Sequence, residues 1–318
     1  MTMPMVSPRR SLRFRLTRTL LVSLAALLGL AGIAVAASGP GSPSQVAALV
    51  RAAPRITTLP VSLRGSVATA SGDTALVATP SLARCITGGT TLPACVFGDP
   101  QGKRTMVLYG DSHALMWFPA VDAIAKSRHW RLIALIELGC PFADLSVWGV
   151  TTNAPYSNCP IFRANMISRI DALDPNLVVL AESYYYLDGQ DRAISTAEWG
   201  TAVEATLGAL HSASMKKVLI GDTISVPSPD TCLAAFPTSI QSCSIAESNP
   251  QYAGQRNADI VAAKAADVGY VNDIPWTCSS VCTAVVGQML VYNSTGHISA
   301  TYATYLTRVL SLALAPSM

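Results

Sequence analysis

The sequence predicts an α/β fold built on a doubly wound parallel sheet. From residue 105 onward, short runs of aliphatic and β-branched residues alternate with longer segments of helical pattern. The short runs are almost continuously apolar, as expected for strands that are buried on both faces. Strands that alternate with helices pair in parallel through crossover connections, so helices should cover both faces of the sheet.

Five predicted strands give the order of the domain. They span residues 105–110, 131–138, 176–183, 216–223 and 268–274, and helices are expected at 113–127, 158–172, 192–213, 254–266 and 297–313. This arrangement is a flavodoxin-like α/β/α sandwich with a central five-stranded parallel sheet. Ligands of such folds bind at the carboxyl ends of the strands, so functional residues should cluster just after each strand.

The first 37 residues predict either a signal peptide or an N-terminal membrane anchor. Five arginines and no acidic residue lie in the first eighteen positions, and the uncharged apolar run 19–37 follows. Ala34-Val35-Ala36 resembles a signal-peptidase site, yet the run is also almost long enough to cross a bilayer once. Both alternatives stay open, and in both the rest of the chain is exported.

Residues 38–94 are expected to be a linker and an irregular lead-in. The stretch from 38 to about 60 is rich in Gly, Pro and Ser, which is typical of a linker, and residues 61–94 carry turn signals without periodicity. The main domain is predicted to span residues 95–318.

The charge of the exported body excludes one class of partner. Without the five N-terminal arginines, 17 basic residues stand against 19 acidic ones. A protein that binds nucleic acid through phosphate contacts needs a basic surface. We therefore expect no nucleic-acid partner.

Eight cysteines agree with export, because an even count in an oxidising compartment indicates disulfides. Pairing of sequence neighbours would close short loops, and it predicts the pairs Cys85–Cys95, Cys140–Cys159, Cys232–Cys243 and Cys278–Cys282. No C-x-x-C pair occurs, which disfavours a zinc site. We expect neither a metal nor a cofactor.

The first predicted strand ends in the sequence Gly110-Asp111-Ser112-His113. Ser112 thus stands at a strand-to-helix turn, where its hydroxyl and its own N–H face the space beyond the strand. The N-terminus of a helix stabilises negative charge, as a developing oxyanion requires. A serine at this position can also be a simple helix cap, so a second residue has to support the catalytic interpretation.

His297 is the candidate second residue. It opens the last predicted helix, which follows the last predicted strand, and so should face the same edge of the sheet as Ser112. A histidine there could take the proton of the serine and return it to a leaving group. The other histidines fit less well: His113 should point elsewhere, and His129 and His211 fall late in predicted helices.

Two sequence blocks together resemble the SGNH (GDSL-type) hydrolase superfamily. One is the Gly110–His113 block after an apolar strand, and the other is Tyr292 followed by His297-Ile298-Ser299. More narrowly, the chain resembles the SGNH domain attached to membrane acyltransferase-3 proteins, which O-acylate cell-surface glycans. The supporting residues, over about 95 to 313, are Cys95 to Asp99, Gly139-Cys140-Pro141, and the cysteines Cys278 and Cys282.

The resemblance implies roles for individual residues. Ser112 matches the nucleophile, His297 the catalytic base, and the N–H groups of Ser112 and Gly139 the oxyanion donors; Asp111 and Ser294 fall in the site loops. In the superfamily an Asp normally stands three residues before the histidine and orients it, whereas this chain has Ser294 there.

Several groups could replace the missing acid. A backbone carbonyl or the Ser294 hydroxyl is one kind, and a carboxylate at a neighbouring strand end, Asp273, Asp222 or Glu182, is the other. We rank Asp273 first, because its strand directly precedes the loop that carries His297.

The resemblance implies an exported serine esterase or O-acyltransferase that acts on O-acyl groups, acetyl above all, of cell-envelope carbohydrate. The implied partners are an acylated glycan, the membrane through the N-terminal segment, and, for transfer, a separate membrane acyl-donor protein. The alternative is a catalytically degenerate module of the same fold that binds glycan or serves in assembly, and the replacement of the Asp by Ser294 is its main support.

One prediction follows from the missing acid. Ser294→Asp should raise kcat for ester hydrolysis, because a carboxylate three residues before the histidine would stabilise the imidazolium that forms during the reaction. Hydrolysis of p-nitrophenyl acetate measures the effect, and an unchanged kcat in the folded variant would show that the acid does not limit turnover.

Overall fold

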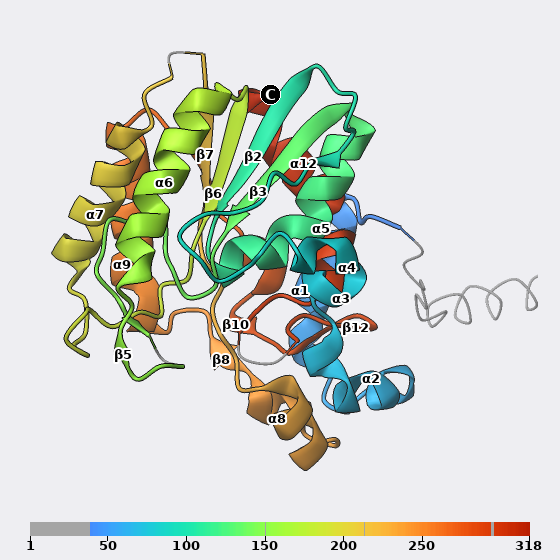
Figure 1. The fold of residues 1–318 in the computed structure, drawn as a ribbon. Helices are drawn as coiled ribbons and strands as arrows, with labels where there is room; N and C mark the ends of the chain where they lie inside the picture. The colour runs from blue at the N-terminus through green and yellow to red at the C-terminus, as the bar shows by residue number, and fades with distance from the viewer. Residues whose placement is uncertain (1–38, 150, 213, 294–295) are drawn as a thin grey trace, which may run out of the picture. The chain divides into compact units, whose positions relative to one another are not determined.

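A six-stranded sheet forms the centre of the domain (Figure 1). The computed structural model describes residues 39–149, 151–212, 214–293 and 296–318. Its sheet has the order β1-β3-β2-β6-β7-β9. The strands are β1 (Phe97–Gly98), β2 (Arg104–Gly110), β3 (Trp130–Ile136), β6 (Leu177–Ala181), β7 (Lys216–Ile220) and β9 (Gly269–Val271).

The predicted parallel sheet is confirmed, with one strand more than expected. β3, β2, β6, β7 and β9 are the five predicted strands, and each pairs in parallel with its neighbour. The additional strand, β1, is two residues long and pairs antiparallel with β3. The strand is too short to form an apolar run that could be recognised in the sequence.

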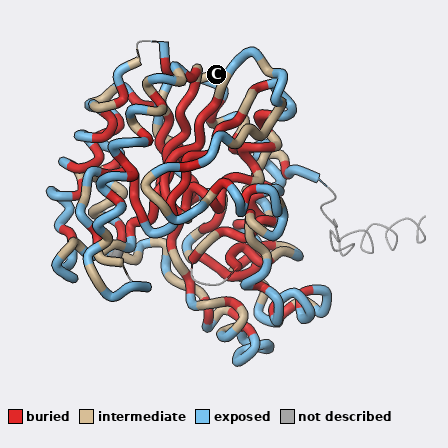
Figure 2. Tube along the Cα trace, in the orientation of Figure 1, coloured by how far each residue is buried: buried red, intermediate tan, exposed pale blue. Residues whose placement is uncertain are grey.

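Helices cover both faces of the sheet, as predicted. One face carries α5 (Ser112–Ser127), α11 (Ala300–Tyr305) and α12 (Thr307–Leu314), and the other carries α6 (Asn158–Leu173), α7 (Thr196–Ala209) and α9 (Ala253–Ala265). Alternate residues of β2 enter the two cores: Met106 and Leu108 on the first face, Val107 and Tyr109 on the second. All four are buried, and Figure 2 shows the buried strands at the centre.

The last helix differs from the prediction. The sequence pattern predicted one helix over 297–313, but the structure has α11 and α12, which begin only at Ala300. Ser299 caps α11, because its side chain accepts a hydrogen bond from the Tyr302 N–H. His297 therefore lies in the loop before the helix.

The segment expected to be a linker contains helix α1 (Pro43–Ala52). Ser42 and Gln45 form a reciprocal capping box, and the proline at the first helical position fits the start of a helix. Val46 and Val50 are buried, so packing of an apolar stripe stabilises this helix. The lead-in continues through α2 (Arg64–Ala68), α3 (Ala75–Ala78) and α4 (Pro80–Ala83).

The lead-in also braces the C-terminal helices. The carbonyl of Asp73 accepts a hydrogen bond from the Ala300 N–H at 3.0 Å, and its carboxylate accepts one from the Thr301 N–H at 3.1 Å. Both donors lie in the first turn of α11, whose N–H groups have no partner within the helix. The lead-in thereby supports the chain segment that follows His297.

Short elements complete the fold between β7 and α11. They are α8 (Pro229–Ala235), α10 (Ile274–Thr277) and two small antiparallel pairs, β8 (Ile245–Ala246) with β10 (Val281–Cys282), and β11 (Val285–Val286) with β12 (Met289–Leu290). A third pair, β4 (Trp148–Gly149) with β5 (Ala154–Pro155), lies between β3 and α6.

The predicted disulfide pairing is confirmed. Each cysteine bonds its neighbour in the sequence, and the four bridges are Cys85–Cys95, Cys140–Cys159, Cys232–Cys243 and Cys278–Cys282. The signal peptide or anchor predicted for residues 1–37 lies outside the described residues. Within the described part of the chain, no helix combines the length and apolarity that crossing a membrane requires.

The end of β2 tolerates only glycine, which gives a testable consequence. Gly110 has φ +149°, and a Cβ there would lie 1.9 Å from the Ala181 carbonyl oxygen on β6. Gly110→Ala should therefore lower the free energy of unfolding by at least about 2 kcal/mol, as judged by urea denaturation. Gly65→Ala is the control, because a Cβ on that glycine of α2 meets no atom within 4 Å. Equal stability of the two variants would contradict the packing described here.

Candidate active site

The turn between β2 and α5 presents Ser112 at the carboxyl edge of the sheet. β2 ends at Gly110, and Ser112 is the first residue of α5. Asp111 caps this helix, since its carboxylate accepts a hydrogen bond from the His113 N–H at 2.7 Å. The hydroxyl of Ser112 is thus not needed as a cap, and Ser112 is only half-buried.

The other carboxylate oxygen of Asp111 fixes the neighbouring loop. It accepts hydrogen bonds from the Ser183 N–H at 2.9 Å and from the Tyr186 hydroxyl at 2.6 Å. Burial raises the pKa of the Asp111 carboxyl, while the charge of His113 and these donors lower it. Asp111 therefore ties the start of α5 to the segment after β6, and we assign it no contact with a reacting atom.

Ser112 and His297 meet in the structure. The Nε2 atom of His297 lies 2.9 Å from the Ser112 Oγ atom, although 185 positions separate the residues in the sequence. Both side chains are half-buried, so the pair is accessible from solvent. An imidazole nitrogen at hydrogen-bond distance from a serine hydroxyl is the geometry that proton transfer requires.

The loop that carries His297 is held against α5. The Ile298 N–H donates to the Met116 sulfur at 3.3 Å, and Met116 lies one turn after Ser112 on the same helix. The Asn293 N–H donates to the His297 carbonyl at 2.9 Å, which closes the loop at its base. These contacts fix the backbone of the histidine relative to that of the serine.

The environment of His297 favours a neutral imidazole. Burial lowers its pKa, the positive charge of His113 lowers it further, and the carboxylate of Asp222 opposes both; the result is a pKa of about 4. At neutral pH the Nε2 atom can accordingly accept the proton of Ser112.

His113 lies beside His297, although its position next to Ser112 in the sequence predicted that it would point elsewhere. Its Nδ1 atom is 2.5 Å from the Asp222 Oδ1 atom, and its ring centroid is 4.6 Å from that of His297. Asp222 follows β7 as Ser112 follows β2, so both reach the same edge of the sheet. Asp222 and Ser112 both follow strand ends, and this shared position is the sequence signal that could have placed His113, which pairs with Asp222, at the site.

The structure does not bring Asp273 onto His297. Asp273 is fully buried after β9, and neither of its carboxylate oxygens has a hydrogen-bond partner within the described residues. Burial and then the charge of Asp222 raise its pKa to about 8. Glu182 instead accepts a hydrogen bond from the Ala143 N–H at 2.9 Å. Ser294, the other candidate, lies outside the described residues.

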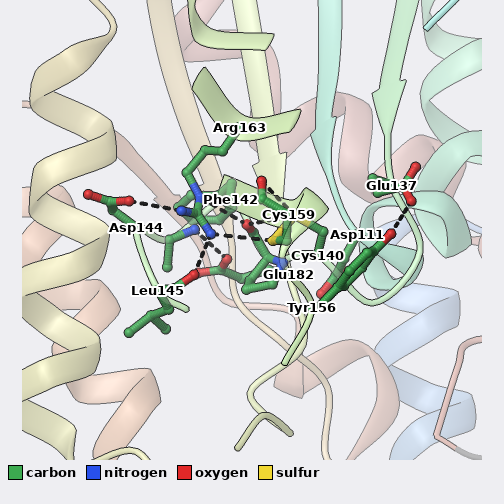
Figure 3. Close-up of a disulfide and its surroundings, with 12 residues drawn as sticks. Asp111, Glu137, Cys140, Phe142, Asp144, Leu145, Tyr156, Cys159, Arg163 and Glu182 are labelled. Atoms are coloured by element: carbon green, nitrogen blue, oxygen red, sulfur yellow. Dashed lines mark hydrogen bonds and ion pairs between the residues drawn. A yellow bond between two sulfur atoms is a disulfide. The ribbon is translucent and has the colours of Figure 1, made fainter. Parts of the chain in front are cut away.

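Gly139, the expected oxyanion donor, lies in the loop after β3. Its φ of +73° is left-handed, and a Cβ added there would meet no atom within 4 Å, so open space adjoins the residue. The adjacent Cys140 forms a disulfide with Cys159 in the first turn of α6 (Figure 3). The disulfide fixes the loop to a helix that packs on the sheet.

Buried Arg163 gives the same loop a second attachment. Its guanidinium donates to the Asp144 carboxylate and to the Leu145 carbonyl, both at 2.8 Å, and to the Pro141 carbonyl at 3.4 Å (Figure 3). The planar fork of Arg suits several acceptors at once. No signal in the sequence marks this residue, because a lone arginine within a helical pattern resembles a solvent-exposed one.

A small aromatic hollow adjoins the segment after β6. Its volume is about 190 Å³, and its lining includes Tyr185, Tyr186, Tyr252 and Gln255. Tyr185 is 71% exposed. The Tyr186 hydroxyl donates a hydrogen bond to the Asp111 carboxylate and so connects the hollow with the turn that carries Ser112. Exposed aromatic rings offer apolar faces on which a ligand can stack.

The described part of the chain contains no group of three or more His, Cys, Asp or Glu side chains that could hold a metal ion. All eight cysteines are in disulfides.

The solved structures include related folds. The periplasmic domain of a lipopolysaccharide acetyltransferase from Salmonella ser. Paratyphi A is 15% identical, with a TM-score of 0.53 over 69% of this chain and 84% of that chain. TesA is 14% identical (TM-score 0.41; 68% of this chain, 100% of that chain), and so is a putative acylhydrolase from Bacteroides fragilis (TM-score 0.42; 70% and 90%). At such identity, the likeness to the acetyltransferase domain shows the fold alone.

Among curated proteins, no sequence matches this chain. The family model described as the SGNH domain fused to AT3 domains, by contrast, matches residues 84–311. That range contains Ser112, Gly139 and His297, and it covers well over half of the sequence. The chain therefore belongs to the SGNH domain family whose members are fused to AT3 domains.

Proposed function

We propose that this protein is an exported serine esterase or O-acyltransferase that acts on O-acyl groups of cell-envelope carbohydrate. The observation that carries the proposal is the 2.9 Å contact between the Ser112 hydroxyl and the His297 Nε2 atom at the carboxyl edge of the sheet. Membership of the SGNH domain family supports acyl-ester chemistry in general. The periplasmic acetyltransferase neighbour supports an extracytoplasmic place.

The reaction begins with attack by Ser112. Its oxygen adds to the acyl carbonyl carbon while the proton passes to the His297 Nε2 atom, and the carbonyl oxygen becomes an oxyanion. The N–H groups of Ser112 and Gly139 are the donors we assign to that oxyanion. Backbone donors fixed in advance stabilise it without reorganisation, and the disulfide and Arg163 hold the Gly139 loop for this purpose.

The second half restores the serine. The tetrahedral intermediate expels the sugar oxygen, which takes the proton from His297, and the acyl group remains as an ester on Ser112. His297 then accepts a proton from water or from a sugar hydroxyl, which attacks the acyl-enzyme, and returns that proton to Ser112. Water gives hydrolysis and a sugar gives transfer, so the two activities differ only in the acceptor.

The aromatic hollow supports a carbohydrate substrate. Tyr185 is exposed there, while Tyr184 and Tyr186 have their hydroxyls engaged with Asp259 and Asp111 and are held rigidly. An exposed aromatic ring suits a sugar ring, which presents an apolar face and polar edges. The near absence of net charge in the exported body is compatible with such a neutral ligand.

Two substitutions test the pair. Ser112→Ala and His297→Ala should each lower kcat/KM for p-nitrophenyl acetate by about 1000-fold, because each removes one member of a unit that acts together. Ser127→Ala, at the other end of α5, and His211→Ala, an exposed histidine, are the matched controls and should retain the activity. The activities are compared in proteins whose disulfides are intact. Thermal unfolding of each variant is measured first, to establish that their stabilities are equal.

A negative result with p-nitrophenyl acetate would reject hydrolysis of this ester and leave two alternatives to be separated. Turnover by the wild-type protein no faster than by Ser112→Ala would reject esterase activity on this ester. A second assay with an acetyl donor and an oligosaccharide acceptor, read by mass spectrometry of the sugar, then separates a transferase from a glycan-binding module. Acetylated sugar formed only with Ser112 present identifies the transferase, and binding without product identifies the module.

A further inference from the structure

His113 and Asp222 form a charged pair at the site that the reaction just described does not use. The Nδ1 atom of His113 is 2.5 Å from the Asp222 Oδ1 atom, and both side chains are almost completely buried. Two backbone N–H groups also donate to this carboxylate, from Tyr184 at 3.0 Å and from Thr223 at 2.9 Å. The pair is thus fixed by α5, by the end of β7 and by the segment after β6.

The ring of His113 lies directly against the ring of His297. The centroids are 4.6 Å apart and the ring planes meet at 52°. His113 directly follows Ser112 at the start of α5, so the first turn of this helix contacts His297 twice. The Ser112 hydroxyl lies at the Nε2 atom of His297, and the His113 ring lies against the His297 ring. His297 is consequently bounded on two sides by consecutive residues of the same helix.

We propose that His113, kept protonated by Asp222, is a positioning residue that acts through His297 and holds it in the neutral form beside Ser112. This inference rests on the proposed function. In a serine–histidine–acid triad, a carboxylate orients the histidine and stabilises its charged form. Here the cation beside His297 acts in the opposite electrostatic sense, because two like charges at this distance disfavour each other.

The surrounding charges agree with this assignment. His113 faces the carboxylates of Asp222, Asp111 and Asp273, and although burial lowers its pKa, these charges raise the value to about 9. His297 faces His113 and Asp222. Arg256 adds a further cation, which donates to the Asp222 carbonyl at 3.1 Å.

The consequence for catalysis is a shifted pH range. A histidine acts as base only while it is neutral, hence above its own pKa, and an ordinary histidine loses this function below about pH 6.5. His297, with a pKa of about 4, keeps it in more acidic conditions. The same cation makes protonated His297 a stronger acid, which speeds proton delivery to the leaving sugar oxygen.

The test compares the pH profile of kcat/KM in wild type and His113→Asn. Removal of the cation leaves the Asp222 carboxylate facing His297, so the acidic limb of the profile should move upward by at least about one pH unit. At pH 4 a one-unit shift lowers the neutral fraction of His297, so the variant should lose activity about fivefold relative to wild type, while at pH 8 the two should differ by less than about threefold. A merely structural role would lower the activity equally at every pH.

Two further variants sharpen the comparison. Asp222→Asn removes the counter-ion that keeps His113 charged, so its acidic limb should lie between those of wild type and His113→Asn. His129→Asn is the control, because His129 forms a similar pair with Asp99 at 2.9 Å but lies at the far end of α5 and is exposed. Its left-handed backbone, with φ 57°, also accepts Asn readily. The control should reproduce the wild-type profile.

A measurement without turnover separates this inference from the proposed function. The chain contains four histidines, so ¹³C-labelled histidine gives an NMR spectrum that single variants can assign. His297 should titrate near pH 4 in the full-length wild-type protein and at least about one unit higher in His113→Asn. Titration of His297 at the same pH in both proteins would overturn the inference. Loss of Ser112-dependent hydrolysis alone would overturn only the proposed function.

Discussion

The site depends on the buried carboxylate of Asp111. Three donors converge on it: the N–H of His113 in the first turn of α5, the N–H of Ser183 after β6, and the hydroxyl of Tyr186. One side chain thus sets the angle at which the helix leaves the sheet and fixes the adjacent aromatic segment. Because the Asp111 carboxylate caps α5, the Ser112 hydroxyl is not needed as a cap and remains available at the open edge of the sheet.

The same edge of the sheet holds several buried carboxyl groups, each of which would be costly to bury without a partner. Asp222, Glu182 and Asp273 follow three neighbouring strands and are buried, so parallel strand ends bring together groups that repel each other. Hydrogen bonds from backbone N–H groups and the pairing of Asp222 with His113 offset the cost of burial in part. Asp273 is left without such a partner among the described residues, and its raised pKa reflects this. Among the described residues, the charged groups that face His297 are His113 and Asp222.

The sequence predicted the five parallel strands, the helices between them and all four disulfides, because buried strands and short cysteine loops leave local patterns. It also predicted Ser112 and His297 as partners from their places at strand ends. It failed where the structure depends on packing between distant segments. Helix α1 was hidden by a Gly/Pro/Ser-rich composition, although the Ser42 cap and buried Val46 stabilise it. His113 was dismissed for its position beside Ser112, since only the loop from residues 296 to 299 brings His297 against it.

The central claim, that His297 activates Ser112, is tested most directly by covalent trapping with a fluorophosphonate. The wild-type protein should gain one adduct, on the peptide that contains Ser112, because the reagent requires an activated hydroxyl. His297→Ala should react at least about 100-fold more slowly, as removal of a general base predicts. An unmodified Ser112 in folded wild-type protein, or an adduct elsewhere such as on exposed Tyr185, would contradict the claim.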